Sequence, residues 1–100
     1  MTVVQLPGRG LNHLDLRVVE FAGRFLGWEV DIAWTPDDEA FAVFGCSEFE
    51  DVVFILTRQA RGYVLSEFPA LSDVPSVYIE SSLQAVFQHL PKTLQYRRSV

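Results

Sequence analysis

The segment VVFIL, residues 52–56, constrains the fold more than any other part of the chain. In an extended strand its side chains alternate between two faces, with Val53 and Ile55 on one and Val52, Phe54 and Leu56 on the other. A strand that is apolar on both faces needs cover on both sides, because an uncovered face exposes a large apolar patch to water. VVFIL is therefore expected to be an interior strand of a sheet.

Two segments before VVFIL are predicted to be further strands. In WEVDIAWT (28–35), tryptophan and aliphatic side chains alternate with acidic and small ones, which is typical of a half-buried strand. AFAVFGC (40–46) is a returning strand after the turn residues PDDE. A helix is the alternative for the second segment, since Thr35 can act as its cap and Pro36 as its first residue. We favour the strand because β-branched and aromatic residues fill the run.

The same choice arises around VVFIL, where Ser47 and Glu50 have the spacing of a helix capping box. We again favour strands, because VVFIL and YVLSEF (63–68) form two apolar runs separated by RQARG. This pattern predicts a hairpin with Gly62 in or beside its turn. SVYIE (76–80) is expected to be one more short strand.

Helical patterns open and close the chain. NHLDLRVVEFAGRFLG (12–27) has Asn12 as a cap and Gly27 as the residue after its end. Its apolar residues are expected to form one buried stripe, made of Leu11, Leu14, Val18, Phe21, Ala22 and Phe25. A second helix, LQAVFQHL (83–90), follows Ser81 or Ser82 as its cap and ends at Pro91. It is expected to bury Leu83, Val86, Phe87 and Leu90.

These elements predict a single α+β domain over residues 1–100, with the last nine residues as a frayed tail. Its order is an N-terminal helix, an antiparallel β-meander of four to five strands and a C-terminal helix. Two helices cover both faces of the sheet only if they lie on opposite sides. If both lie on one side, a second copy is expected to close the other, so the sequence predicts a homodimer.

The formal charge of −5 is spread unevenly, because residues 25–57 contain eight acids and no Lys or Arg. The acids divide between a strand face, a turn and the next connection, so we expect solvated surface rather than a converging catalytic or metal site. With the aromatic residues nearby, they predict a surface for a basic protein partner, and the residues assigned to it are Trp34, Asp37, Asp38, Glu39, Glu48 and Glu50. Binding to nucleic acid is not expected from this charge balance.

An alternative function is a small-molecule, nucleotide-binding or enzymatic site near the start of the first helix. Gly8 and Gly10 precede that helix, and Asp31 follows about twenty residues later, which is the outline of a dinucleotide-binding motif. His13 stands at the third glycine position, where its bulk opposes close packing. The ligand-binding residues of this alternative are Gly8, Gly10, His13 and Asp31.

Other chemistries have little support in the sequence. Cys46 is the only cysteine, so no internal disulfide forms, and a reducing cytoplasm is the expected location. His13 and His89 are far apart, and no zinc, P-loop or nucleophile-elbow motif occurs. No apolar stretch reaches the roughly 20 residues that cross a bilayer. We therefore expect a binding domain rather than an enzyme, without cofactor, metal or membrane.

Overall fold

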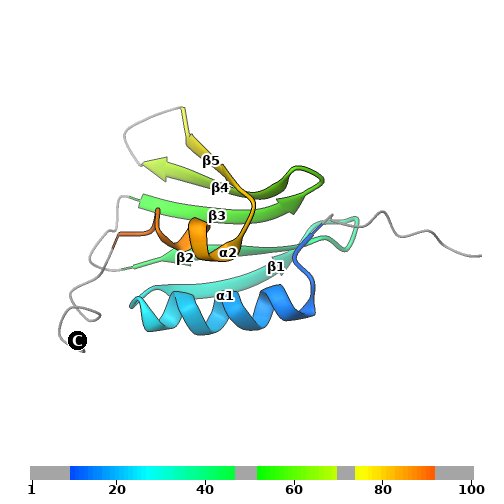
Figure 1. The fold of residues 1–100 in the computed structure, drawn as a ribbon, viewed down its shortest axis with the longest axis horizontal. Coiled ribbons are helices and arrows are strands. Elements are labelled where there is room, and N and C mark those ends of the chain that lie inside the picture. The colour runs from blue at the N-terminus through cyan, green and yellow to red at the C-terminus, as the bar shows by residue number, and fades with distance from the viewer. Residues whose placement is uncertain (1–9, 47–51, 70–73, 92–100) are drawn as a thin grey trace, which may run out of the picture.

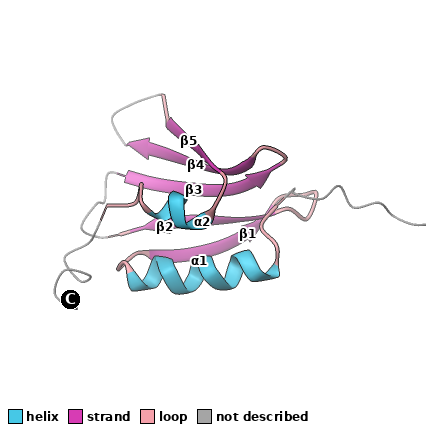
Figure 2. Cartoon of the chain, viewed as in Figure 1, coloured by secondary structure: helices cyan, strands magenta, loops and turns pink. Residues whose placement is uncertain are grey.

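The structure, a computed structural model, describes residues 10–46, 52–69 and 74–91. In chain order its elements are α1 (His13–Phe25), β1 (Glu29–Trp34), β2 (Ala40–Gly45), β3 (Val52–Gln59), β4 (Gly62–Pro69), β5 (Ser76–Glu80) and α2 (Leu83–Phe87). A helix, a run of strands and a short helix follow one another (Figure 1, Figure 2), so the predicted α+β fold is confirmed.

The five strands form one antiparallel meander in the order β1-β2-β3-β4-β5. VVFIL lies in β3, the middle strand, as its two apolar faces predict. Residues 40–45 form a strand and not the alternative helix. The turn between β3 and β4 contains two residues, and Gly62 follows it with a φ of 129°, a backbone conformation that residues with a side chain rarely adopt.

Both helices lie on the same face of the sheet. α1 contacts β1, β2 and α2, and α2 contacts β4 and β5 as well (Figure 1). The buried core lies between the helices and this face, and it consists of Leu11, Val19, Trp28, Ala40, Ala42, Phe44, Phe54, Leu56, Leu65, Val86 and Leu90. No helix of the described chain covers the opposite face of the sheet, which we call the open face.

Trp28, directly before β1, contacts both the sheet and the segment that follows α2. Its ring packs edge-on against Phe54 at 5.4 Å between centroids, and its Nε1 donates a hydrogen bond to the Pro91 carbonyl at 2.9 Å. α2 begins after Ser82, whose hydroxyl caps the Ala85 amide, and Val86 is fully buried. A large aromatic residue in the middle of the core thus holds the segment that follows α2.

The predicted start and end of α1 are confirmed. The Asn12 side chain accepts a hydrogen bond from the Asp15 amide at 2.8 Å, and Asp15 accepts one from the Asn12 amide at 3.0 Å. These two bonds form a capping box. Gly27 follows the helix with a φ of 87°, as predicted for the residue that ends it.

The prediction of the buried face of α1 is wrong for four of its six residues, whereas Leu11, directly before the helix, is buried as predicted. Leu14, Val18, Phe21 and Phe25 are exposed by 69, 47, 76 and 59%, and we call these four residues the outer stripe. The helix instead buries Asp15, Val19 and Gly23. This less apolar face is buried because it has specific partners in the sheet, which the spacing of apolar residues does not reveal.

Gly23 is one reason for this orientation, since its missing side chain lets α1 approach the sheet closely. A Cβ atom at this position would lie 2.5 Å from Val30 Cγ2 and 2.9 Å from Phe44 Cε1, closer than nonbonded carbon atoms approach. No such limit applies to Gly45, around which nothing lies within 4 Å of an added Cβ atom.

We predict that Gly23→Ala lowers the free energy of unfolding, although alanine favours helix formation by about 1 kcal/mol. The overpacking against Val30 and Phe44 costs about 1–3 kcal/mol and outweighs that gain. Urea denaturation measures the change, and Gly45→Ala is the matched control, expected to change stability by less than about 0.5 kcal/mol. A Gly23→Ala protein as stable as the control contradicts the close packing of α1.

Candidate functional site

A buried carboxylate at the start of α1 organises the most polar part of the core. Asp15 is only 6% exposed. Arg58 Nη1 in β3 donates a hydrogen bond to Asp15 Oδ2 at 3.1 Å, and the Tyr63 hydroxyl in β4 donates one to Asp15 Oδ1 at 2.7 Å. With the Asn12 amide on Oδ2, both carboxylate oxygens have partners. We call Asp15, Arg58 and Tyr63 the polar cluster.

The charges and hydrogen-bonding groups of the polar cluster complement one another. Burial raises the pKa of the Tyr63 phenol above its usual 10.0, and the hydrogen bond to Asp15 and the charge of that carboxylate raise it further. The Arg58 guanidinium opposes this change. The same guanidinium lies 5.6 Å from the centroid of the Tyr63 ring, a cation–π distance. The cluster therefore holds the start of α1 against the β3–β4 hairpin.

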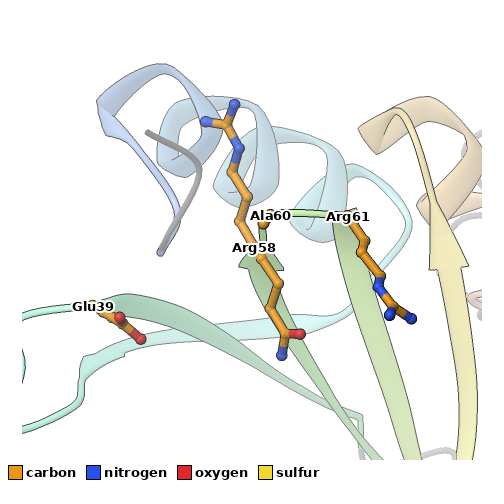
Figure 3. Close-up of a pocket in the computed structure, with 5 residues that line it drawn as sticks. Glu39, Arg58, Ala60 and Arg61 are labelled. Atoms are coloured by element: carbon orange, nitrogen blue, oxygen red, sulfur yellow. The ribbon is translucent and has the colours of Figure 1, made fainter. Parts of the chain in front are cut away.

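A shallow hollow of about 390 Å³ lies beside the polar cluster and is lined by Glu39, Arg58, Gln59, Ala60 and Arg61. Figure 3 shows Arg58 extending toward α1, whereas Arg61 points away from it and Glu39 stands apart, in the connection directly before β2. The two guanidinium groups therefore do not converge on one point. Because Arg58 is already paired with Asp15, this hollow offers a ligand little more than a loosely arranged surface.

The acids of residues 29–39 line one edge of the sheet. Glu29 and Asp31 lie on the open face of β1, since they pair with Gly45 and Val43 of β2. Asp37 and Asp38 are exposed in the β1–β2 turn, where Asp38 has a φ of 60°. We call these four residues the acidic edge. As predicted, they fall into a strand group and a turn group.

The other residues assigned to the protein-binding surface are more scattered. Trp34 lies at the end of β1, on the helix side of the sheet, and is 60% exposed, unlike the buried Trp28 on the same side. Glu39 is half-buried and its amide donates to Thr35 Oγ1 at 3.2 Å. Glu48 and Glu50 lie outside the described residues.

The residues of the alternative ligand site are not brought together. Gly10 has a φ of 76°, and a Cβ atom there would lie 3.0 Å from the Ala40 amide nitrogen, so its backbone packs closely against the chain itself. His13 is exposed at the start of α1. Asp31 lies on the open face, on the side of the sheet away from α1. Gly8 lies outside the described residues.

The sequence identifies both faces of β3 as apolar, but not how far the apolar surface extends over the neighbouring strands. The strand register places side chains from β2 to β5 on this face, with Glu29, Asp31 and Ala33 beside them on β1. The large apolar members are Phe41, Val43, Val53, Ile55, Val64, Phe68, Val77 and Ile79. No Lys or Arg of the described strands lies on it. The alternation of each strand was visible in the sequence, but the side taken by the helices was not.

One further pair of titratable side chains joins β5 to the segment after α2. His89 Nε2 lies 3.1 Å from Glu80 Oε1, and its ring stacks on Tyr78 at 4.2 Å between centroids. Cys46 is free and half-buried. Within residues 10–46, 52–69 and 74–91, no three His, Cys, Asp or Glu side chains are grouped so that they could hold a metal ion. Every buried side-chain nitrogen and oxygen in these ranges has a hydrogen-bond partner.

Comparison of the chain with protein-family models, with curated proteins and with solved structures found no match in any of the three. In the part of the chain that is described, no helix is long and apolar enough to cross a membrane. The function is therefore inferred from the geometry of the domain alone.

We predict that Tyr63→Phe destabilises the domain by about 1.5–3 kcal/mol at neutral pH, because a hydrogen bond to a buried carboxylate is lost. The raised pKa means that the folded protein holds the phenol proton more tightly than the unfolded chain. The advantage of the wild type is therefore complete below pH 10.0 and decreases as the pH rises above it.

Urea denaturation of both proteins from neutral pH to above pH 10.0 measures this difference, with Tyr78→Phe as the control for the other described tyrosine. A difference between wild type and Tyr63→Phe that stays constant above pH 10.0 contradicts the assigned role of the phenol.

Proposed function

We propose that this protein is a non-catalytic, cytoplasmic binding domain. It pairs with a second copy through the open face and engages a basic protein partner through Asp37 and Asp38, the two turn residues of the acidic edge. The observation that carries the proposal is that both helices lie on one side of a sheet whose other side is also apolar. Val77 and Ile79 are each 53% exposed there, which is more surface than an isolated domain usually leaves in water.

The size of the open face suits a modest homodimer. Five strands spaced by about 4.8 Å, each contributing about five residues, give a flat footprint of roughly 300–400 Å². The relief of the side chains increases the accessible area above this value. A pair of such faces lies at the small end of specific interfaces, so we expect self-association at micromolar concentrations.

The charges on the open face favour one way of pairing. If the two-fold axis runs along the strands, β1 of one copy lies over β5 of the other, where the face is formed by Val77 and Ile79. The acids of the two copies are then separated. An axis across the strands instead places Glu29 and Asp31 opposite the same residues of the second copy, which like-charge repulsion disfavours.

Pairing of this kind leaves the turn acids accessible. Asp37 and Asp38 extend beyond the end of the sheet, outside the footprint of the open face. They form a negative, solvated surface without neighbouring Lys or Arg in sequence, suited to attract a basic partner over a distance. The proposed binding activity thus resides in Asp37 and Asp38, and the open face sets the number of binding sites in the pair.

We predict that Val53→Lys prevents self-association, because Val53 lies on the open face of the middle strand β3 and the variant places an unpaired charge at the centre of the pair. Light scattering at micromolar concentrations is expected to give about twice the chain mass of 11.3 kDa for the wild type and the single mass for the variant. Ser76→Lys is the matched control, since this exposed residue of β5 lies on the helix side of the sheet. A wild-type protein of 11.3 kDa at these concentrations refutes the dimer.

We predict that Asp37→Asn/Asp38→Asn weakens capture of the basic partner from native cell extract several-fold and makes the remaining capture less sensitive to salt. Asparagine tolerates the positive φ of residue 38, so the turn is preserved. Glu20→Gln/Glu67→Gln removes the same charge elsewhere and is the control. If both double variants capture as the wild type does, the acidic edge is not the binding surface.

A further inference from the structure

The outer stripe of α1 is a second apolar surface, on the opposite layer of the domain from the open face. Its four side chains are between 47 and 76% exposed. The rings of Phe21 and Phe25 stack at 6.3 Å between centroids with 12° between their planes, so they form one continuous ridge. Burial against the sheet accounts for the other face of α1, whereas the outer stripe lies on the side that remains exposed.

The spacing of the outer stripe indicates what kind of element fits it. Leu14, Val18, Phe21 and Phe25 are separated by four, three and four residues. This is the heptad spacing of a helix that packs against another helix over its length. The 13 residues of α1 span about 20 Å, or between three and four turns, which is enough for a short two-helix seam.

Two arginines border the outer stripe on the same edge. Arg17 and Arg24 are seven residues apart, and each directly precedes a stripe residue, which are the flanking positions of a heptad seam. Both are exposed, and neither forms a salt bridge among the described residues. They border a shallow hollow of about 580 Å³ together with Glu20, Phe21 and Phe25.

We propose that the outer stripe docks an amphipathic helix of a partner protein. That helix carries apolar residues at the same heptad spacing and Asp or Glu at the positions that face Arg17 and Arg24. Apolar contacts with Phe21 and Phe25 supply the affinity, and the two arginines select the sign of the charge and the direction of the helix. This surface is separate from the open face and from the acidic edge.

Charge complementarity favours this occupant over a second copy of the chain. In an antiparallel pair of α1 helices, the flanking positions of equal type meet, so Arg17 of one copy lies beside Arg24 of the other. A parallel pair places Arg17 beside Ala22 and gives it no acid. An anionic membrane is disfavoured because the chain carries a net charge of −5 and would be repelled as a whole.

Binding of designed peptides tests the proposal on the full chain. The first probe is a fluorescent helical peptide with leucine at heptad spacing and glutamate at the flanking positions, and the second is the same peptide with lysine in place of glutamate. Fluorescence anisotropy is expected to show saturable binding of the glutamate peptide and at least about tenfold weaker binding of the lysine peptide. Arg17→Glu/Arg24→Glu is expected to reverse this preference.

Two further variants control the result. Phe21→Ser is expected to weaken binding of the glutamate peptide at least about tenfold. Arg61 is an exposed residue of the β3–β4 turn, and Arg61→Glu is expected to leave binding unchanged. Since all these positions are exposed, urea denaturation should show unaltered folding. Val53→Lys, the dimer variant, should still bind the peptide, which separates this surface from the open face.

Several outcomes overturn the proposal. One is equal binding of the two peptides, or binding of neither at millimolar concentration. A second is that the wild type sediments with vesicles of phosphatidylcholine and phosphatidylglycerol and Phe21→Ser does not. This result would assign the outer stripe to a membrane surface. A third is loss of self-association in Phe21→Ser, which assigns it to a second copy.

Discussion

The architecture of the domain depends on the interior strand β3, which is apolar on both faces, while residues 10–46, 52–69 and 74–91 contain two helices. Both helices cover the same face of the sheet and close a core around Phe44, Phe54 and Leu56. Every buried side-chain nitrogen and oxygen of the described residues has a hydrogen-bond partner. The other face remains as apolar as a sheet in a sandwich. The helix side of the sheet is thus covered within the chain, and the proposed second copy would cover the other side.

The polar cluster and Gly23 determine which side of α1 meets the sheet. Asp15 finds Arg58 and Tyr63 on β3 and β4, and Gly23 allows the helix to settle onto Val30 and Phe44. A hydrogen-bonded carboxylate and a missing side chain therefore decide an orientation that apolar area alone would reverse. The large apolar residues of α1 are left at the surface, where they are available for intermolecular contacts rather than for the core.

The sequence predicts the elements better than it predicts their faces. Alternation in residues 28–35 and 52–56 correctly identifies β1 and β3, and Asn12 and Gly27 correctly mark the ends of α1, since these signals are local. The buried side of α1 depends on Asp15 contacts with residues 43 and 48 positions away, which no local pattern contains. For the same reason, the apolar open face and the separation of Asp31 from Gly10 emerge only from the three-dimensional arrangement.

The long sequence separation of these contacts has a consequence for the order of folding. During synthesis α1 emerges first, yet Arg58 and Tyr63 follow only after most of the meander has been made. The hairpins of the sheet join neighbouring segments and can form early, whereas closing the loops to Asp15 is entropically slower. Both sides of α1 are therefore solvent-exposed on the nascent chain, and this interval is when the domain is most open to aggregation or to chaperone binding.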